Sequence, residues 1–319
     1  MAAPERWDEA CFAVPALRAL VASGLGVGVL CAEEQRDFWS TVEGLAVVAF
    51  PVKSKPRALA AGIAGNWQAS LAWEPGIAAE SFKLAGISRR LGADHPKLKK
   101  FLTQPLAFQV GPLEHGVRHY LAAVEALGIE TGRAEFYAPA ALGIVPNPAA
   151  VLLCPGSDFG ANHEWPVERW LEIARSLMGC GQRVTVASEV GGRGLGKILA
   201  HALGEDAEFF QVSSLAGALP LLAVHATVVA ADGSLPHLAA HAGATCVTLF
   251  GPNDPAWKRP LGRRHAGHEA AAGVRVRVQC RRSQRGAQRV CRAVRAAQGR
   301  RGGAGAGRAH SARAGCALC

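Results

Sequence analysis

The segment Asp232-Gly233-Ser234 joins an apolar run to an amphipathic stretch in the second half of the chain. If a strand ends and a helix begins there, the unpaired N–H groups and dipole of the helix favour a bound phosphate. Gly233 permits close approach of the backbone, and Ser234 offers a hydroxyl as ligand or helix cap. His237, one turn further on, could face the same ligand. The segment predicts a phosphate-binding turn. In the alternative interpretation Asp232 and Ser234 only cap the helix and His237 packs against the sheet.

A second polar loop follows an apolar run that ends at Cys154. Ser157 stands directly after this run and could donate a hydrogen bond to a phosphate, while Pro166 suits the first turn of the next helix. The alternative is a plain Pro/Gly turn in which Trp165 provides packing. Glu189, after the following predicted strand, is a candidate for contact with the ribose of a nucleotide or, alternatively, a solvated loop acid.

Alternating strands and helices must position these loops. Hydrophobic periodicity and breaker residues predict strands at 151–154, 183–187, 209–212, 227–231 and 245–250, and helices at 167–178, 195–203, 215–226 and 235–242. Such alternation is typical of a doubly wound parallel sheet, where ligands bind at the carboxyl ends of strands. The loops after Cys154, Ala187, Ala231 and Phe250 are therefore the candidate binding loops.

The first half of the chain has a similar but weaker pattern. It predicts helices at 15–23, 78–86 and 115–127 and strands at 27–31 and 45–50. Three glycines between 24 and 28 follow a helix and lead into a strand, which is the reverse of a phosphate loop, so we interpret them as a helix stop and turn. Three prolines and no periodicity predict an interdomain linker at 139–150.

Charge is distributed unevenly along the chain. The net charge is +10, but residues 263–319 carry 14 arginines, no lysine and one acid, so the first 262 residues sum to −3. The composition of the first 262 residues therefore gives no reason to expect nucleic-acid binding. No run is apolar for long enough to cross a bilayer, and the polar N-terminus does not resemble a signal peptide. We expect a cytoplasmic protein with reduced thiols and, because no cysteine, histidine or acid set has zinc spacing outside the tail, no metal.

The two polar loops carry a resemblance to a known family. Residues 232–239 read DGSLPHLA and residues 249–255 read LFGPNDP. They resemble the Asp-Ser/Thr-Gly-x-x-His-Leu-Ala element and the Leu-Phe-Gly-Pro-Thr-Asp-Pro element of glycosyltransferase family 9, the ADP-heptose:lipopolysaccharide heptosyltransferases, with the glycine and hydroxyl positions exchanged. In that family the first element holds the diphosphate of the nucleotide sugar.

Other segments extend the resemblance to about residues 5–262. The loop 154–166 is similar to the family's Pro-Gly-Ala/Ser…Lys-x-Trp-Pro stretch, with His163 at the position of a lysine that neutralises phosphate. Because histidine is only partly charged near neutrality, this change affects nucleotide affinity or activity. Segments 85–92 and 15–20 also resemble family sequence. The family's catalytic carboxylate falls on Glu9, with Asp8 before it, but the glycine that normally precedes it is absent.

The resemblance implies a GT-B fold: two Rossmann-like doubly wound α/β domains that face each other across a cleft. We expect an acceptor-binding domain at 1–138, whose first strand falls upstream of Met1, the linker, and a nucleotide-sugar domain at 151–262. The implied reaction is an inverting, metal-independent and cofactor-independent transfer of heptose from ADP-heptose to the lipopolysaccharide inner core. Glu9 or Asp8 would deprotonate the acceptor hydroxyl, although acids near a terminus are often only solvated.

The resemblance also implies where the substrates bind. The donor would contact Ser157, His163, Glu189, Asp232, Gly233, Ser234 and His237. The basic residues Arg89, Arg90, Lys97, Lys99 and Lys100 lie in the acceptor-binding half. Positive charge there would attract the carboxylates and phosphates of lipopolysaccharide, at the cytoplasmic face of the inner membrane, although a solvated basic face is the alternative.

The Arg-, Ala- and Gly-rich segment 263–319 breaks with the preceding composition. A shifted reading frame in a GC-rich gene explains this bias, so we expect a disordered or frame-shifted tail. Two other functions stay open. The altered base loop and the lysine-to-histidine change suit a non-catalytic homologue that binds sugar nucleotides, and the tail suits nucleic-acid binding, although it lacks the aromatic residues that would stack on bases.

Overall fold

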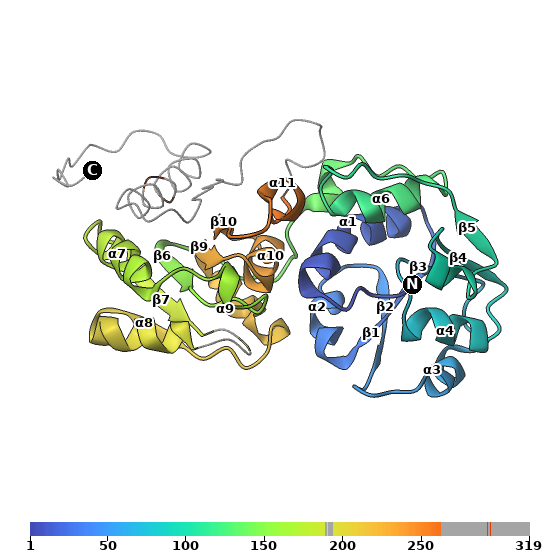
Figure 1. Cartoon of the computed structure of the whole chain (residues 1–319), viewed down its shortest axis with the longest axis horizontal. Coiled ribbons are helices and arrows are strands. Elements are labelled where there is room, and N and C mark those ends of the chain that lie inside the picture. The colour runs from blue at the N-terminus through green and yellow to red at the C-terminus, as the bar shows by residue number, and fades with distance from the viewer. Residues whose placement is uncertain (189, 191–193, 263–291, 293, 295–319) are drawn as a thin grey trace. The chain divides into compact units, whose positions relative to one another are not determined.

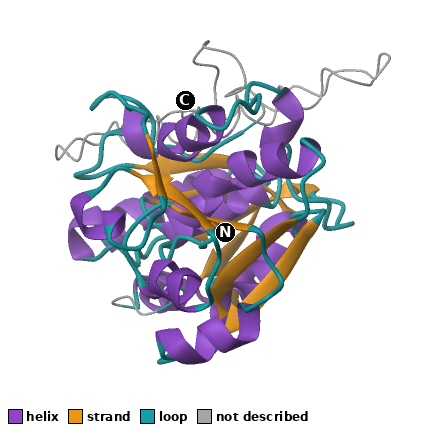
Figure 2. Ribbon diagram, turned by 90° about the vertical axis from the view of Figure 1, so that its right-hand side faces the viewer, coloured by secondary structure: helices purple, strands orange, loops and turns teal. Residues whose placement is uncertain are grey.

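The computed structural model describes residues 1–188, 190, 194–262, 292 and 294 (Figure 1). Within these residues the chain forms two compact units, an N-terminal unit of Met1–Ala138 and a C-terminal unit that begins at Pro139 and runs to Gly262. Each unit has parallel strands with helices packed around them (Figure 2). Among the described helices, none combines the length and apolar character that crossing a membrane requires.

The N-terminal unit contains two parallel sheet segments. Strands β1 (Val27–Ala32) and β2 (Leu45–Phe50) form the first, and β3 (Ala69–Ala72), β4 (Arg89–Ala93) and β5 (Gln104–Leu106) form the second. Its helices are α1 (Trp7–Ala22), α2 (Arg36–Ser40), α3 (Pro56–Ile63), α4 (Ile77–Leu84), α5 (Pro96–Lys99) and α6 (Val117–Glu125). Helix α1 packs on α6, and α3 packs on α4.

The first three residues connect the two sheet segments. Ala2 forms a parallel bridge with Leu30 of β1, and the amide of Ala2 donates to the carbonyl of Leu71 in β3. Met1–Ala3 therefore occupy the position of a first strand, although the sequence analysis expected none. With this segment counted first, the strand order becomes 3-2-1-4-5-6, which is the order of a Rossmann sheet.

Helix α1 begins earlier than the sequence indicated. The proline at position 15 suggested a helix start, but α1 runs from Trp7 with Pro15 inside it. A proline in a helix interior costs about 3 kcal/mol, and here Phe12 and Leu17, both fully buried, belong to the apolar surface that offsets this cost. As a consequence, Asp8 and Glu9 lie in the first helical turn, where the helix dipole favours negative charge.

The residues that lead into α1 are held by Gln35. Its Nε2 donates to the carbonyls of Pro4 and Glu5 at 3.0 and 3.1 Å, and its Oε1 accepts from the indole N–H of Trp39 at 3.1 Å. Gln35 is 1% exposed, so these bonds replace water that the buried amide no longer contacts. This amide fixes the direction in which α1 leaves the sheet.

The C-terminal unit contains one five-stranded parallel sheet in the order β10-β9-β6-β7-β8. Its strands are β6 (Asn147–Cys154), β7 (Arg183–Ala187), β8 (Glu208–Phe210), β9 (His225–Ala231) and β10 (Thr245–Leu249). Its helices are α7 (Val167–Met178), α8 (Leu195–Leu203), α9 (Leu219–Val224), α10 (Ser234–His241) and α11 (Pro255–Lys258). The order is 3-2-1-4-5 when read from β8, again a Rossmann arrangement.

The core of this unit joins α7 and α8 to the sheet. Trp170, Ile173 and Leu177 of α7 are buried together with strand residues such as Val151. These are the positions at i, i+3 and i+7 that predicted an amphipathic helix. Val294, from the segment after Gly262, is also fully buried in this cluster.

Several boundaries differ from the sequence prediction. The expected linker 139–150 ends earlier, because β6 begins at Asn147. The expected helix 215–226 is a short 3₁₀ turn followed by α9, and β9 already begins at His225. Apolar residues dominate this region, so periodicity alone did not separate the helix from the strand. The shorter elements α2, α3, β3, β4, α5, β5 and α11 were not predicted at all.

Helix α8 approaches the end of β7 closely at Gly196. A Cβ atom on this glycine would lie 2.8 Å from the Cα of Ser188 and closer still to the carbonyl oxygen of Ala187. Real Cβ atoms do not make such contacts, so only glycine allows the observed packing distance. Gly62 in α3 is the opposite case, with open space around its Cβ position.

We expect Gly196→Ala to lower the free energy of unfolding by about 1–3 kcal/mol, because the added methyl group forces α8 away from β7. Urea unfolding followed by circular dichroism measures this change. Gly62→Ala is the matched control and should be neutral or stabilising, since alanine favours a helix more than glycine. Equal stability of Gly196→Ala and the wild type would show that the close packing does not exist.

We expect Gln35→Met to destabilise the protein by about 1–3 kcal/mol, because side-chain volume is kept while two carbonyls and an indole N–H lose their partner. Hydrogen exchange in the first turn of α1 should become faster. The control Gln68→Met changes an exposed glutamine and should have little effect. If both variants unfold at the same urea concentration, Gln35 does not anchor the start of α1.

Candidate active site

A cavity of about 890 Å³ lies in the N-terminal unit, at the carboxyl ends of its first strands. Residues that follow Met1–Ala3 line one side, and residues that follow β3 line another. This is the switch point of the Rossmann order. On one side of the first strand the sheet continues toward one edge, and on the other side it continues toward the opposite edge. The charged and polar side chains that line it include Glu5, Arg6, Glu9, Lys53, Glu74, His119 and Tyr120.

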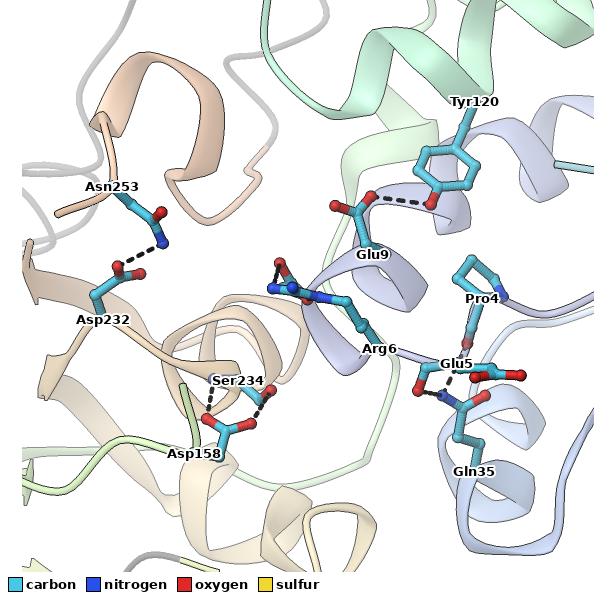
Figure 3. Close-up of polar contacts among 11 residues, drawn as sticks. Pro4, Glu5, Arg6, Glu9, Gln35, Tyr120, Asp158, Asp232, Ser234 and Asn253 are labelled. Carbon is cyan, nitrogen blue, oxygen red and sulfur yellow. Dashed lines mark hydrogen bonds and ion pairs between the residues drawn. The ribbon is translucent and has the colours of Figure 1, made fainter. Parts of the chain in front are cut away.

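Glu9 is oriented by a hydrogen bond from the neighbouring helix α6. The hydroxyl of Tyr120, in α6, donates to Oε2 of Glu9 at 2.9 Å (Figure 3). Tyr120 is buried and packs edge-on against Trp73, with ring centroids 5.1 Å apart. Burial and the neighbouring Glu9 raise the pKa of Tyr120 well above its usual range, so the phenol stays protonated and donates. Glu9 is thus a carboxylate held at the cavity wall by a fixed donor.

Asp8 has a different environment. It is fully buried, and the guanidinium of Arg6 donates to both of its carboxylate oxygens at 3.1 Å. Asp8 is not among the residues that line the cavity, whereas Glu9 and Arg6 are. Of the two candidate bases, the structure therefore brings only Glu9 to the cavity.

The cavity lining carries charges of both signs, with more acidic than basic residues. Partial burial, followed by the carboxylates of Glu9 and Glu5, raises the pKa of Glu74, while His119 and Arg6 act in the opposite direction. Among the lining residues, Arg6 and Lys53 supply positive charge. The cavity can therefore contact both hydroxyl groups and anionic groups of a ligand.

The basic stretch 89–100 is not brought to this cavity. Arg89 and Arg90 begin β4, at the edge of the sheet opposite the strand ends that form the cavity. Arg90 donates to the carbonyls of Phe101 and Ile87, and the ammonium of Lys100 lies over the ring of Phe101 at 4.9 Å. Neither Lys97 nor Lys99 lines the cavity either.

In the C-terminal unit, the loops after β6 and β9 meet. These strands are neighbours at the point where the strand order reverses, so their carboxyl ends form a crevice. Ser157, from the first loop, is 3% exposed and donates from Oγ to the carbonyl of Asp232 at 2.6 Å. Two segments 75 residues apart in the chain are joined by this bond.

The carboxylate of Asp232 is buried and held by two side chains. Nδ2 of Asn253 donates to its Oδ2 at 2.8 Å, and Nδ1 of His163 lies 2.9 Å from the same oxygen (Figure 3 shows the contact with Asn253). The His163 side chain is 15% exposed. The structure therefore brings His163 and Asp232 together, as the sequence interpretation requires for one common site.

Helix α10 begins at Ser234, and Gly233 before it is extended. The amide and hydroxyl of Ser234 donate to the two carboxylate oxygens of Asp158 at 2.8 and 2.5 Å (Figure 3). A Cβ at position 233 would lie 2.8 Å from Oδ1 of Asp158 and 3.2 Å from Oγ of Ser157, so glycine permits this approach. His237 is buried within α10, and Glu189 lies outside the described residues.

Sequence reasoning missed several residues of these two sites. Asp158 and Asn253 lie inside the quoted motifs, but nothing in the sequence indicated that they contact Ser234 and Asp232. Tyr120 and Gln35 had no local signal, because their partners lie 111 and about 30 residues away. Only the packing of these distant elements in the folded unit brings them together.

Similar proteins are found by family model and by structure. Residues 123–285, about half of the chain, match the family model for glycosyltransferase family 9 (heptosyltransferase). This match continues past Gly262, where the sequence analysis placed the end of the resemblance. No curated protein sequence matches the chain.

Solved structures with the same fold include heptosyltransferases of Escherichia coli. ADP-heptose lipopolysaccharide heptosyltransferase II is 18% identical with a TM-score of 0.71, over 94% of this chain and 98% of that one. Heptosyltransferase WaaC with ADP-2-deoxy-2-fluoro heptose is 19% identical with a TM-score of 0.67, over 92% and 98%. A family 9 glycosyltransferase of Veillonella parvula is 12% identical with a TM-score of 0.69, over 92% and 89%.

These likenesses agree with two doubly wound α/β units of GT-B type and confirm the expected fold class. The family match covers the β6 and β9 loops, where Ser157, His163 and Asp232 converge. The chain belongs to glycosyltransferase family 9, the heptosyltransferases, and is a glycosyltransferase.

Proposed function

We propose that this glycosyltransferase moves a heptose from ADP-heptose to a lipopolysaccharide inner-core acceptor with inversion at the anomeric carbon and without a metal. The observation that carries the proposal is the meeting of Ser157, His163, Asp232 and Ser234 at the switch point of the C-terminal unit. Nucleotides bind at this point in doubly wound sheets. Relatives of the same fold were solved with ADP and with a fluorinated ADP-heptose, which supports the choice of donor.

The donor's diphosphate would bind at the amino end of α10. The amide and hydroxyl of Ser234 lie at this end, where they donate to Asp158, and Gly233 leaves room for an oxygen atom beside the backbone. Ser157 and His163 would add donors from the β6 loop, and His237 from α10. Such preorganised donors stabilise the charge that develops on the departing ADP. We keep Glu189 as a candidate contact to the ribose.

Glu9 would act as the general base. Its carboxylate accepts a hydrogen bond from Tyr120, and Glu9 lines a cavity large enough for a sugar. In the proposed step Glu9 takes the proton of the acceptor hydroxyl, the hydroxyl oxygen forms a bond to the anomeric carbon, and the bond from that carbon to ADP breaks. Attack from the face opposite ADP inverts the configuration. Asp8 would act indirectly, by holding Arg6 at the cavity.

The acceptor's negative groups would contact Arg6 and Lys53, which line the cavity. Arg89, Arg90, Lys97 and Lys100 lie elsewhere on the N-terminal unit, so we propose that they contact more distant phosphates of the same large acceptor. An acceptor of this kind is anchored in a lipid layer. The enzyme would therefore work at the cytoplasmic face of the inner membrane through peripheral contact.

We expect Glu9→Gln to lower the turnover of ADP-heptose by about 10²–10⁴-fold, because the amide cannot accept the proton. ADP affinity should stay within about twofold, since the donor is assigned to other residues. Turnover is measured as labelled heptose transferred to heptose-deficient lipopolysaccharide, with other nucleotide sugars in parallel. Glu130→Gln, which changes an exposed acid of the same unit, is the control and should keep full turnover.

Three results would contradict parts of this proposal. Transfer from another nucleotide sugar, but not from ADP-heptose, would exclude the proposed donor. Retained anomeric configuration in the product, measured by NMR, would exclude direct displacement. ADP binding by the wild type without any transfer would identify a non-catalytic homologue.

We expect His163→Lys to strengthen ADP binding by about three- to tenfold, because a permanent charge replaces a partial one beside the diphosphate. Calorimetric titration with ADP measures the change. Adenosine, which has no phosphate, should bind both proteins equally. The titration is repeated at two pH values, one on either side of neutrality. Unchanged or weaker ADP binding at both pH values would remove His163 from the diphosphate site.

A further inference from the structure

Asp158 occupies the place that an anionic ligand would take at α10. Its two carboxylate oxygens accept from the amide and the hydroxyl of Ser234 at 2.8 and 2.5 Å. These are the donors that the proposed function assigns to the diphosphate. A carboxylate and a phosphate present similar oxygen acceptors to a helix end, so the two compete for the same hydrogen bonds.

The crevice around this contact is closed. Gly156, Asp158, Gly233 and Leu235 are among its lining residues, and it has no room for a water-sized sphere. A diphosphate is far larger than a water molecule. For a diphosphate to reach the amide of Ser234, the Asp158 side chain has to move.

Asp158 is free to make that movement. Asp158 is exposed, although its carboxylate accepts hydrogen bonds from Ser234, and it lies in the loop between Gly156 and Gly160. Gly160 has a φ of 105°, which side-chain-bearing residues rarely adopt, so the loop turns at a glycine two residues after Asp158. By contrast, Ser157 next to it is buried and bonded to Asp232.

Electrostatic repulsion would determine the direction in which the Asp158 side chain moves. Asp232 is already a buried carboxylate at this site, and His163, whose imidazole contacts it, is charged only when protonated. A diphosphate that arrived with Asp158 still in place would meet the carboxylates of both Asp158 and Asp232. Repulsion between the diphosphate and Asp158 would push the side chain toward solvent, where its exposed position allows it to be hydrated.

We propose that Asp158 is a displaceable internal competitor of the donor's diphosphate. This inference rests on the proposed function. In the empty protein the carboxylate caps α10 and satisfies its first donors, and in the complex the diphosphate replaces it. A ligand must then carry enough negative charge to displace Asp158, which favours nucleoside diphosphates over uncharged nucleosides. After transfer, Asp158 competes with ADP and promotes its release.

Asp158→Asn tests the competition by removing the charge while keeping the side-chain size. We expect it to raise ADP affinity about tenfold by calorimetric titration and to leave adenosine affinity unchanged. Asp206→Asn is the matched control, an exposed aspartate of the same unit that precedes β8 at the opposite edge of the sheet, and should change neither. The gain in ADP affinity should persist at about 1 M salt, because salt screens an interaction between groups in contact far less than the field of a distant charge.

Thermal unfolding provides a second readout. Without ligand, Asp158→Asn should unfold at a lower temperature than the wild type, because the α10 cap is weakened. With saturating ADP the two proteins should unfold at the same temperature or the variant higher, since Asp158 no longer contributes its cap in the complex. Asp158→Ala should give the same pattern with a larger loss in the empty protein.

The outcomes separate this inference from the proposed function. ADP binding by the wild type that Asp158→Asn leaves unchanged or weakens overturns the competitor role alone. A gain in ADP affinity that disappears at about 1 M salt also overturns it, because Asp158 would then act only through its long-range electrostatic field. A variant that stays less stable than the wild type at saturating ADP overturns it as well, because Asp158 would then keep its contact with Ser234 in the complex. Failure of both wild type and variant to bind ADP overturns the proposed donor site and this inference with it.

Discussion

The reversal of strand order in each parallel sheet is the constraint on which both sites depend. Where neighbouring strands lead to helices on opposite sides, their carboxyl ends leave a gap that only loops and helix ends can fill. In the C-terminal unit the gap lies between β6 and β9, and in the N-terminal unit between Met1–Ala3 and β3. Backbone donors and polar side chains gather there because no strand satisfies or covers them.

The carboxylates at these gaps differ in burial, and the degree of burial indicates the role each can have. Asp8 and Asp232 are fully buried and hold partners in place, Arg6 in one case and Asn253 with His163 in the other. A buried charge that is held by hydrogen bonds is costly to move, so such groups suit positioning. Glu9 and Asp158 have access to a cavity or to solvent, so they can change partners. Their accessibility suits proton transfer and displacement.

The proposed donor site of this chain is less positive than the family pattern implies. His163 stands where the resemblance places a lysine, and the carboxylate of Asp158 lies on the amide that would hold a phosphate. Both features reduce attraction for a diphosphate. Weaker product binding benefits an enzyme whose turnover depends on release of its product.

The sequence by itself determined the C-terminal unit most completely. Helix α7 at 167–178 and strand β7 at 183–187 match their predicted bounds, because apolar spacing within one element reports the face it buries. The motifs around Asp232 likewise identified the family. Only the tertiary structure decided that Met1–Ala3 act as a strand, since three residues have no periodicity. It also decided that Glu9, not Asp8, meets the cavity, because that depends on partners from distant strands and helices that no local pattern encodes.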